Sequence, residues 1–224
     1  MKRLHEFKAR IEQQVADHEA RTASDPAYRV EVEARSAELE AQARGYEVLR
    51  REEHLRAIGL PERLAEILAL PLADTQALAA VRAWLDRDLT FLVLGGSVGV
   101  GKTVAAASAF VERGGLFRKA SQITRMSQFD EESWDRLYRA RLLVVDDLGT
   151  EPHDQGGWAT AALLDLFDRR YDARARTILT VNITVETFRQ RYGQDGGRFL
   201  DRLRESGEWF NVAGESMRRP GGVR

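Results

Sequence analysis

The sequence predicts a three-layer α/β fold in which a largely parallel, five-stranded sheet lies between helices, preceded by an N-terminal helical region. Two observations support this prediction. Short apolar runs such as "TFLVL" and "RLLVV" alternate with helix-like segments in the second part of the chain, which is typical of parallel strands joined by helical crossovers. Hydrophobic residues make up 43% of the 224 residues, so a packed core is expected.

Residues 1–58 are the predicted helical region, because they are highly charged with mixed signs and contain no strand-like run. The segment "TASDPAY" interrupts the helical pattern, and there Asp25 can cap a new helix with Pro26 at its first position. Two interpretations stay open: a solvated appendage that packs on its own domain, or a partner-binding arm. The thin apolar stripes, at spacings of three and four, are Leu4, Phe7, Ile11, Val15 and His18, then Val32, Ser36, Leu39, Ala43, Tyr46 and Leu49 or Arg50.

Residues 59–219 are the predicted α/β domain, and residues 220–224 a flexible tail. Two short helices are expected first, in "AIGLPERLAEIL" and "DTQALAAVRAWL". The expected order is then strand "TFLVL", helix 102–113, strand "GGLFRKA", strand "RLLVV", helix 158–171, strand "RTILTVN", helices 185–192 and 196–205, and strand "EWFNVA".

Bulk properties limit the classes of function. The formal net charge is −1, which does not indicate a globally basic nucleic-acid-binding protein, although a local basic patch is compatible with it. The chain has no cysteine, which excludes disulfides and cysteine-ligated zinc. No apolar run approaches the ~20 residues that span a bilayer. We therefore expect a cytoplasmic protein.

A glycine-rich loop between the first predicted strand and its helix carries the strongest chemical signal. Its sequence fits G-x-x-x-x-G-K-[ST], the loop whose backbone N–H groups surround the phosphates of a nucleoside triphosphate. Lys102 can reach the β- and γ-phosphates, and the Thr103 hydroxyl can bind Mg²⁺. An ordinary glycine-rich turn would not need this strand–loop–helix context. The predicted nucleotide-binding residues are Gly96, Ser97, Val98, Gly99, Val100, Gly101, Lys102 and Thr103.

Two further segments add polar groups at strand ends. The run "RLLVV" ends in Asp146 and Asp147, and Asp146 would hold Mg²⁺ through water while Asp147 polarises the attacking water. The strand "RTILTVN" ends in Asn182, which can bond the γ-phosphate or the lytic water if its strand lies beside the other two. Asn182 could instead cap the following helix with Thr184. The adjacent acids favour hydrolysis over simple nucleotide holding.

Taken in order, these segments resemble the AAA+ ATPases, a branch of the ASCE P-loop NTPases, and within them the DnaC-type helicase loaders and IstB-type transposition helpers. The resemblance covers roughly residues 55–219. "GGSVGVGKT", "LLVVDDLGTE" and "RRYDARARTILTVNIT" are similar to the Walker A, Walker B and sensor 1 segments, and "GGRFLDRLRESGEWFNVAGESMR" to the C-terminal signature. The resemblance implies ATP and Mg²⁺ as cofactors, with Asp146 for Mg²⁺, Asp147 as base, Asn182 as sensor 1, Arg202 as arginine finger and Arg218 as sensor 2.

Several functions remain in competition. The first is an ATP-hydrolysing loader that binds a replicative DNA helicase, delivers it to single-stranded DNA and works in a self-associated or partner-templated ring or spiral. The second is a helper of DNA transposition. A small-molecule kinase would need an acceptor pocket and an arginine-rich lid, for which the sequence offers no candidate. A non-enzymatic adaptor would not need Asp147.

Contact with single-stranded DNA is expected where basic and aromatic residues lie together, because cations suit phosphates and aromatic rings stack on bases. The alternative is equally compatible with the sequence: the aromatic rings belong to a core, and the basic groups face solvent. The candidates are Arg118, Lys119, Arg125, Trp134 and Tyr138.

Overall fold

The computed structural model describes residues 2–151, 157–214 and 216, without the side chains of residues 2–9, 11 and 159. The chain divides into two compact units, residues 1–53 and 54–224. In the described part of the chain, no helix is both long and apolar enough to cross a membrane.

The first unit consists of helix α1 (Lys2–Ser24) and most of helix α2 (Pro26–Ala57). The two helices meet at Asp25, whose Oδ1 accepts the backbone N–H groups of Ala27 and Tyr28, so the predicted cap is present. Arg21 lies over the Tyr28 ring at 4.0 Å. No described side chain between residues 10 and 53 is buried, so this unit has no core of its own there.

The second unit is built on one five-stranded sheet in which every paired strand is parallel. The strand order is β2-β3-β4-β1-β5, so the fourth strand in the sequence lies between the first and the third. This confirms the predicted α/β class. The strands are β1 (Phe91–Gly95), β2 (Leu116–Lys119), β3 (Leu142–Leu148), β4 (Arg176–Val181) and β5 (Gly207–Asn211).

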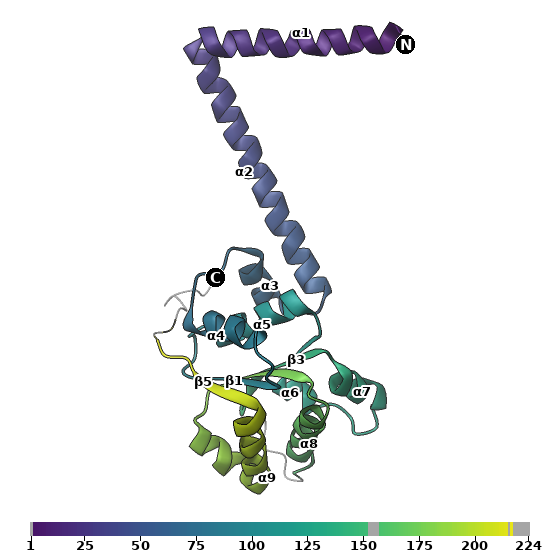
Figure 1. Ribbon diagram of the computed structural model, residues 1–224, viewed down its shortest axis with the longest axis vertical. Coiled ribbons are helices and arrows are strands. Elements are labelled where there is room, and N and C mark those ends of the chain that lie inside the picture. Colours follow the sequence, from purple (N-terminus) through teal and green to yellow (C-terminus); the bar gives the residue numbers. More distant parts are fainter. Residues whose placement is uncertain (1, 152–156, 215, 217–224) are drawn as a thin grey trace. The chain divides into compact units, whose positions relative to one another are not determined.

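Helices cover both faces of this sheet, giving the three layers (Figure 1). Helices α4 and α5 lie on one face, and α8 and α9 on the other (Figure 1). The non-helical Gly193 divides α9 at the point where two separate helices were predicted. The helices of this unit are α3 (Glu62–Ala69), α4 (Gln76–Leu85), α5 (Lys102–Arg113), α6 (Ala120–Ile123), α7 (Glu131–Arg139), α8 (Trp158–Asp172) and α9 (Val185–Ser206).

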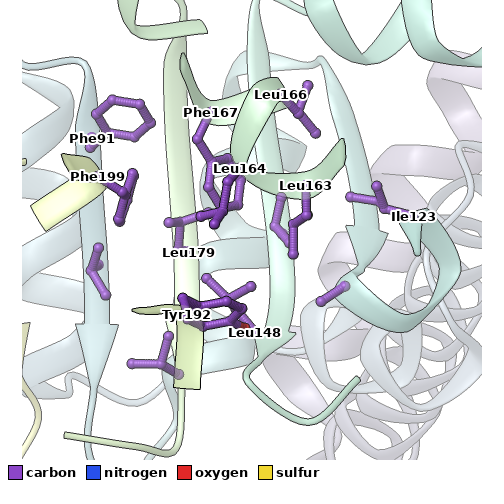
Figure 2. Close-up of a cluster of buried hydrophobic side chains, with 14 of the residues drawn as sticks. Phe91, Ile123, Leu148, Leu163, Leu164, Leu166, Phe167, Leu179, Tyr192 and Phe199 are labelled. Atoms are coloured by element: carbon purple, nitrogen blue, oxygen red, sulfur yellow. The ribbon is translucent and has the colours of Figure 1, made fainter. Parts of the chain in front are cut away.

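The main hydrophobic core lies between the sheet and helices α8 and α9 (Figure 2). Phe199 of α9 packs edge-on against Phe91 of β1, with ring centroids 5.3 Å apart, and also contacts Phe167 of α8. Burying each such aromatic side chain stabilises the fold by roughly 1.5–3 kcal/mol. The core therefore fixes α8 and α9 on the sheet and leaves the carboxyl ends of the strands free for chemistry.

A buried arginine fastens the amino ends of two strands. Arg170 of α8 is fully buried and donates to the carbonyl oxygens of Leu137, Ala140 and Arg176 and to the Thr177 hydroxyl, at 2.6–3.0 Å. Burial lowers the pKa of the Arg170 guanidinium to about 10. Because β3 and β4 begin beside these carbonyls, Arg170 connects the starts of both strands to the end of α7. This is the amino end of the strands, whereas the glycine-rich loop lies at their carboxyl end.

Candidate active site

The glycine-rich loop connects β1 to α5, as predicted, and its backbone requires glycine at specific points. Gly96 has φ 134°, and a Cβ there would lie 2.4 Å from the Val212 carbonyl oxygen, so no other residue fits. Gly101 has φ 89° and stands immediately before the first residue of α5. The loop can therefore turn its N–H groups toward the helix N-terminus, where an anion is stabilised.

Lys102 is 6% exposed and lies within the loop that precedes it. Its Nζ donates to the carbonyl oxygens of Gly96 at 2.8 Å and Ser97 at 2.6 Å, and to Asn182 Oδ1 at 2.8 Å. These acceptors carry no formal charge, so phosphate oxygens are stronger partners for the ammonium group. Lys102 is thus held at the mouth of the loop in a position to exchange carbonyl oxygens for phosphate.

Asp146 lies near the carboxyl end of β3 and is 2% exposed. Its Oδ1 accepts the hydroxyl groups of Thr103 at 2.8 Å and Thr180 at 2.7 Å. Burial raises the pKa of Asp146 above its ordinary value, and the neighbouring charge of Asp147 acts in the same direction. A bound cation would reverse this effect by favouring the carboxylate.

Asp147 occupies an unusual backbone position, with φ 56°. The register between β3 and β4 shifts between Val145 and Leu148, so the strand is irregular at the two acids. The Asp147 N–H donates to the Thr180 hydroxyl at 2.9 Å, and Asn182 Nδ2 donates to Asp147 Oδ1 at 3.3 Å. The left-handed conformation turns consecutive carboxylates in different directions, one toward Thr103 and the other toward Asn182.

The strand order explains why Asn182 reaches both sides of the site. Strand β4 lies between β1 and β3, so Asn182 at its end bridges Lys102 and Asp147. It is not the cap of α9, because Thr184 fills that position and accepts the N–H of Thr187. Thr180, which orients both acids, was not predicted. The only feature of the sequence that could have indicated this role is a single threonine inside the apolar run "ILTV".

The donor set suits a magnesium ion. The Thr103 hydroxyl and one Asp146 oxygen are 2.8 Å apart, and both are hard oxygen ligands. Within the described ranges, no cluster of three or more His, Cys, Asp or Glu side chains could hold a metal. Mg²⁺ commonly takes only one or two protein oxygens and completes its shell with phosphate and water, so these two residues fit the ion.

The predicted arginine finger lies in α9 and has an acidic partner. Arg202 pairs with Asp168 of α8 and lies over the Tyr171 ring at 5.1 Å. Arg198, one helical turn before Arg202, makes an exposed pair with Asp195 at 3.3 Å. Because α9 runs back toward the start of β5, Arg202 lies nearer the amino ends of the strands than the glycine-rich loop does. Arg218 lies outside the described residues.

The predicted DNA-contact residues separate into core and surface. Trp134 is 7% exposed, stacks on Tyr138 and donates Nε1–H to the Ser127 carbonyl, so its ring belongs to the core and cannot stack on a base. Arg118 and Lys119 line a cavity of about 270 Å³ beside the edge strand β2. Phe129, which the sequence reading did not single out, is 82% exposed in the loop between α6 and α7.

Comparison with known protein families gives a match over most of the second unit. The sequence model of the family described as "IstB-like ATP binding protein" matches residues 69–221. No curated protein gives a significant sequence match.

Among solved structures, the DnaC helicase loader is 20% identical, covering 68% of this chain and 100% of its own, with a TM-score of 0.53. DnaI is 18% identical over 69% and 95% of the two chains, with a TM-score of 0.53. The replication initiator DnaA bound to AMPPCP and single-stranded DNA is 17% identical over 66% and 50%, with a TM-score of 0.52. At these identities the likenesses support the fold.

Proposed function

The chain belongs to the family of IstB-like ATP-binding proteins, and from this premise we propose that it binds Mg²⁺·ATP and hydrolyses it to ADP and phosphate. The observation that carries the proposal is the continuous polar chain at the carboxyl ends of three adjacent strands. Lys102 of the loop contacts Asn182, and Asn182 contacts Asp147. A site that only held nucleotide would not need a carboxylate beside the amide that orients water.

In this proposal each residue has one task. The glycine-rich backbone and Lys102 hold the phosphates, while Thr103 and Asp146 hold Mg²⁺, which neutralises charge on the β- and γ-phosphates. Asp147 accepts a proton from the attacking water as the new P–O bond forms and the bond to ADP breaks. Asn182 orients that water or the γ-phosphate.

We further propose that Arg202 completes the site of a neighbouring subunit. Arg202 lies toward the amino ends of the strands, whereas its own glycine-rich loop lies at their carboxyl ends. Arg202 is paired with Asp168, so it must leave that carboxylate before it can bind a phosphate of a neighbouring subunit. An arginine that neutralises the transferred phosphoryl group increases the rate by ~10³–10⁵-fold in related chemistry. The isolated subunit is then a weak ATPase, and a ring or spiral is the active form.

The biological task we propose is loading of a replicative DNA helicase onto single-stranded DNA. The first unit supports a partner-binding role, because its helices leave large apolar side chains in solvent: Val15, Val30, Leu39, Tyr46 and Leu49 are 50–68% exposed. Helices with no core of their own gain stability when a partner covers such side chains. ATP binding and hydrolysis would then time capture and release of the helicase.

For single-stranded DNA we propose contacts around β2 and the α6–α7 loop. Lys119 and Arg125 are exposed cations, and Phe129 supplies the free aromatic ring that Trp134 does not. Stacking of a base on an aromatic ring contributes about 1–3 kcal/mol. Phe129→Ala should weaken binding of an oligothymidylate at least fivefold on that scale, while Trp134 lies too deep to contribute directly.

A loading assay tests the proposed task. The full chain, the replicative helicase of the source cell and a circular single strand are mixed with ATP, and helicase retained on the circle is measured. The full chain should increase loading, whereas Lys102→Ala should not. A protein comprising residues 54–224, which keeps the buried Leu55, should hydrolyse ATP yet fail to load. Helicase loading that needs neither the first unit nor ATP would contradict the proposal.

The second candidate is a helper of DNA transposition, which the IstB-like family match favours. Both candidates share the ATPase chemistry and differ in the protein that the first unit binds. Affinity capture with the full chain and a non-hydrolysable ATP analogue distinguishes them, since recovery of a transposase instead of a replicative helicase would select the second.

A further inference from the structure

Glu151 is a buried carboxylate to which the proposed chemistry assigns no task. It lies in the loop after β3, four residues beyond Asp147, and its side chain is 2% exposed. Carboxylates are almost never buried to this degree unless they are paired. The contacts that keep Glu151 buried therefore indicate what it does.

Its two carboxylate oxygens bind two different parts of the molecule. Oε2 accepts the backbone N–H of Gly149 at 2.8 Å, within the same loop. Oε1 accepts the Tyr192 hydroxyl and, at 3.4 Å, Nε of Arg191, both in α9. The Arg191 guanidinium also donates to the Glu151 carbonyl oxygen. Glu151 is thus a junction between the loop after the catalytic acids and the first half of α9.

The loop that Glu151 holds contains the strained part of the site. Asp147 has φ 56° and Gly149 has φ 95°, and a Cβ at Gly149 would lie 2.8 Å from Ile183. The Thr150 hydroxyl donates to the Asp147 carbonyl oxygen at 2.7 Å and closes the turn. Strained backbone of this kind persists only when surrounding contacts determine it from several sides. Thr180 provides one such contact before the turn, and Glu151 provides the contact after it.

We propose that Glu151 is a positioning residue for hydrolysis: by joining Gly149 to Arg191 and Tyr192, it fixes the turn that orients the Asp147 carboxylate. This rests on the proposed ATPase function and extends it to α9. The anchor on α9 is firm, because Tyr192 is buried and packs on Phe188, with ring centroids 4.5 Å apart. It also lies directly before the break at Gly193, so the first half of α9 is fastened to the acid loop.

The test compares Glu151→Gln with the parent protein and with Glu186→Gln, a control that removes an exposed carboxylate from the first turn of the same helix. Phosphate release gives kcat, and titration with a fluorescent ATP analogue gives Kd. Glu151→Gln should lower kcat at least tenfold, since a misplacement of about 1 Å can cost about 10²-fold, while Kd stays within about threefold. Glu186→Gln should match the parent in both.

A second variant keeps the proposal testable if Glu151→Gln does not fold. Tyr192→Phe leaves the carboxylate and its bond to Gly149 in place but removes one contact to α9, and it should lower kcat with Kd unchanged. The double variant should be no slower than Glu151→Gln, because both changes break one connection. Parent-like kcat in Tyr192→Phe or in folded Glu151→Gln overturns the proposal, as does a loss of kcat and ATP affinity in equal proportion. A parent protein that hydrolyses no ATP at any concentration refutes the ATPase function instead.

Discussion

Replacement of Asp147 by two different residues separates its chemical role from its backbone role. Asn tolerates φ 56° and keeps an oxygen for the Asn182 contact, so Asp147→Asn removes the carboxylate and little else. Ala tolerates that conformation poorly, at a cost of roughly 1–2 kcal/mol. In a domain of this size that corresponds to a fall in melting temperature of about 2–8 °C. Loss of a general base lowers turnover by about 10²–10⁴-fold.

Both variants should therefore bind Mg²⁺·ATP and hydrolyse it slowly, but only Asp147→Ala should melt early. The assays are phosphate release at saturating ATP, fluorescent-nucleotide titration, and thermal unfolding without nucleotide, so that ligand binding does not mask the backbone effect. Turnover at the parent rate in Asp147→Asn would show that another group accepts the proton. Equal melting temperatures for the two variants would refute the argument from the left-handed backbone.

Three further outcomes are expected. Lys102→Ala should weaken ATP binding at least tenfold in a fluorescent-nucleotide titration, because a charge-assisted bond is worth about 1.5–3 kcal/mol, and unchanged affinity would remove the loop assignment. Asp146→Asn should end Mg²⁺-dependent hydrolysis yet raise the melting temperature at neutral pH. Burial raises the pKa of Asp146, so the fold favours the neutral carboxyl, and the stability that this form contributes is lost as the pH rises through the raised pKa. Arg202→Ala should bind ATP normally and hydrolyse it poorly, and mixing it with Lys102→Ala should restore part of the activity if the finger acts between subunits.

The nucleotide loop was predictable because its chemistry is local. Gly96, Gly101 and Lys102 follow from a contiguous pattern, and the positive φ angles at both glycines are the conformations that the pattern requires. The strand and helix order was predictable for a related reason, since each buried strand is a short apolar run with its own turn signals. The bridge made by Asn182 depends on strand order, which no local pattern encodes.

The remaining features depend on tertiary contacts between residues far apart in the sequence. Trp134 reads as a DNA-binding aromatic beside basic residues, yet contacts with Tyr138 and Trp158 place it in the core. Arg202 pairs with Asp168 of α8, 34 positions earlier in the sequence, and no local pattern around Arg202 indicates that partner. Thr180 resembles any β-branched residue of a buried strand, and its role appears only when the Asp146 carboxylate and the Asp147 N–H lie beside its hydroxyl.

In the proposed mechanism Asn182 connects nucleotide binding to hydrolysis, because the ammonium group that would bind phosphate is one of its hydrogen-bond partners. Lys102 donates to Asn182 Oδ1, while Asn182 Nδ2 donates to Asp147 Oδ1. Transfer of Lys102 to phosphate would release the Asn182 oxygen for the lytic water. Asn182→Ala should therefore keep or slightly strengthen ATP binding, since it removes a competitor for the ammonium, but lower turnover at least tenfold. A fluorescent-nucleotide titration and a phosphate-release assay measure the two effects, with Thr187→Ala, a change at an exposed α9 residue, as the matched control. Weaker ATP binding in Asn182→Ala with unchanged turnover of the bound nucleotide would reverse the assignment and make Asn182 a binding residue alone.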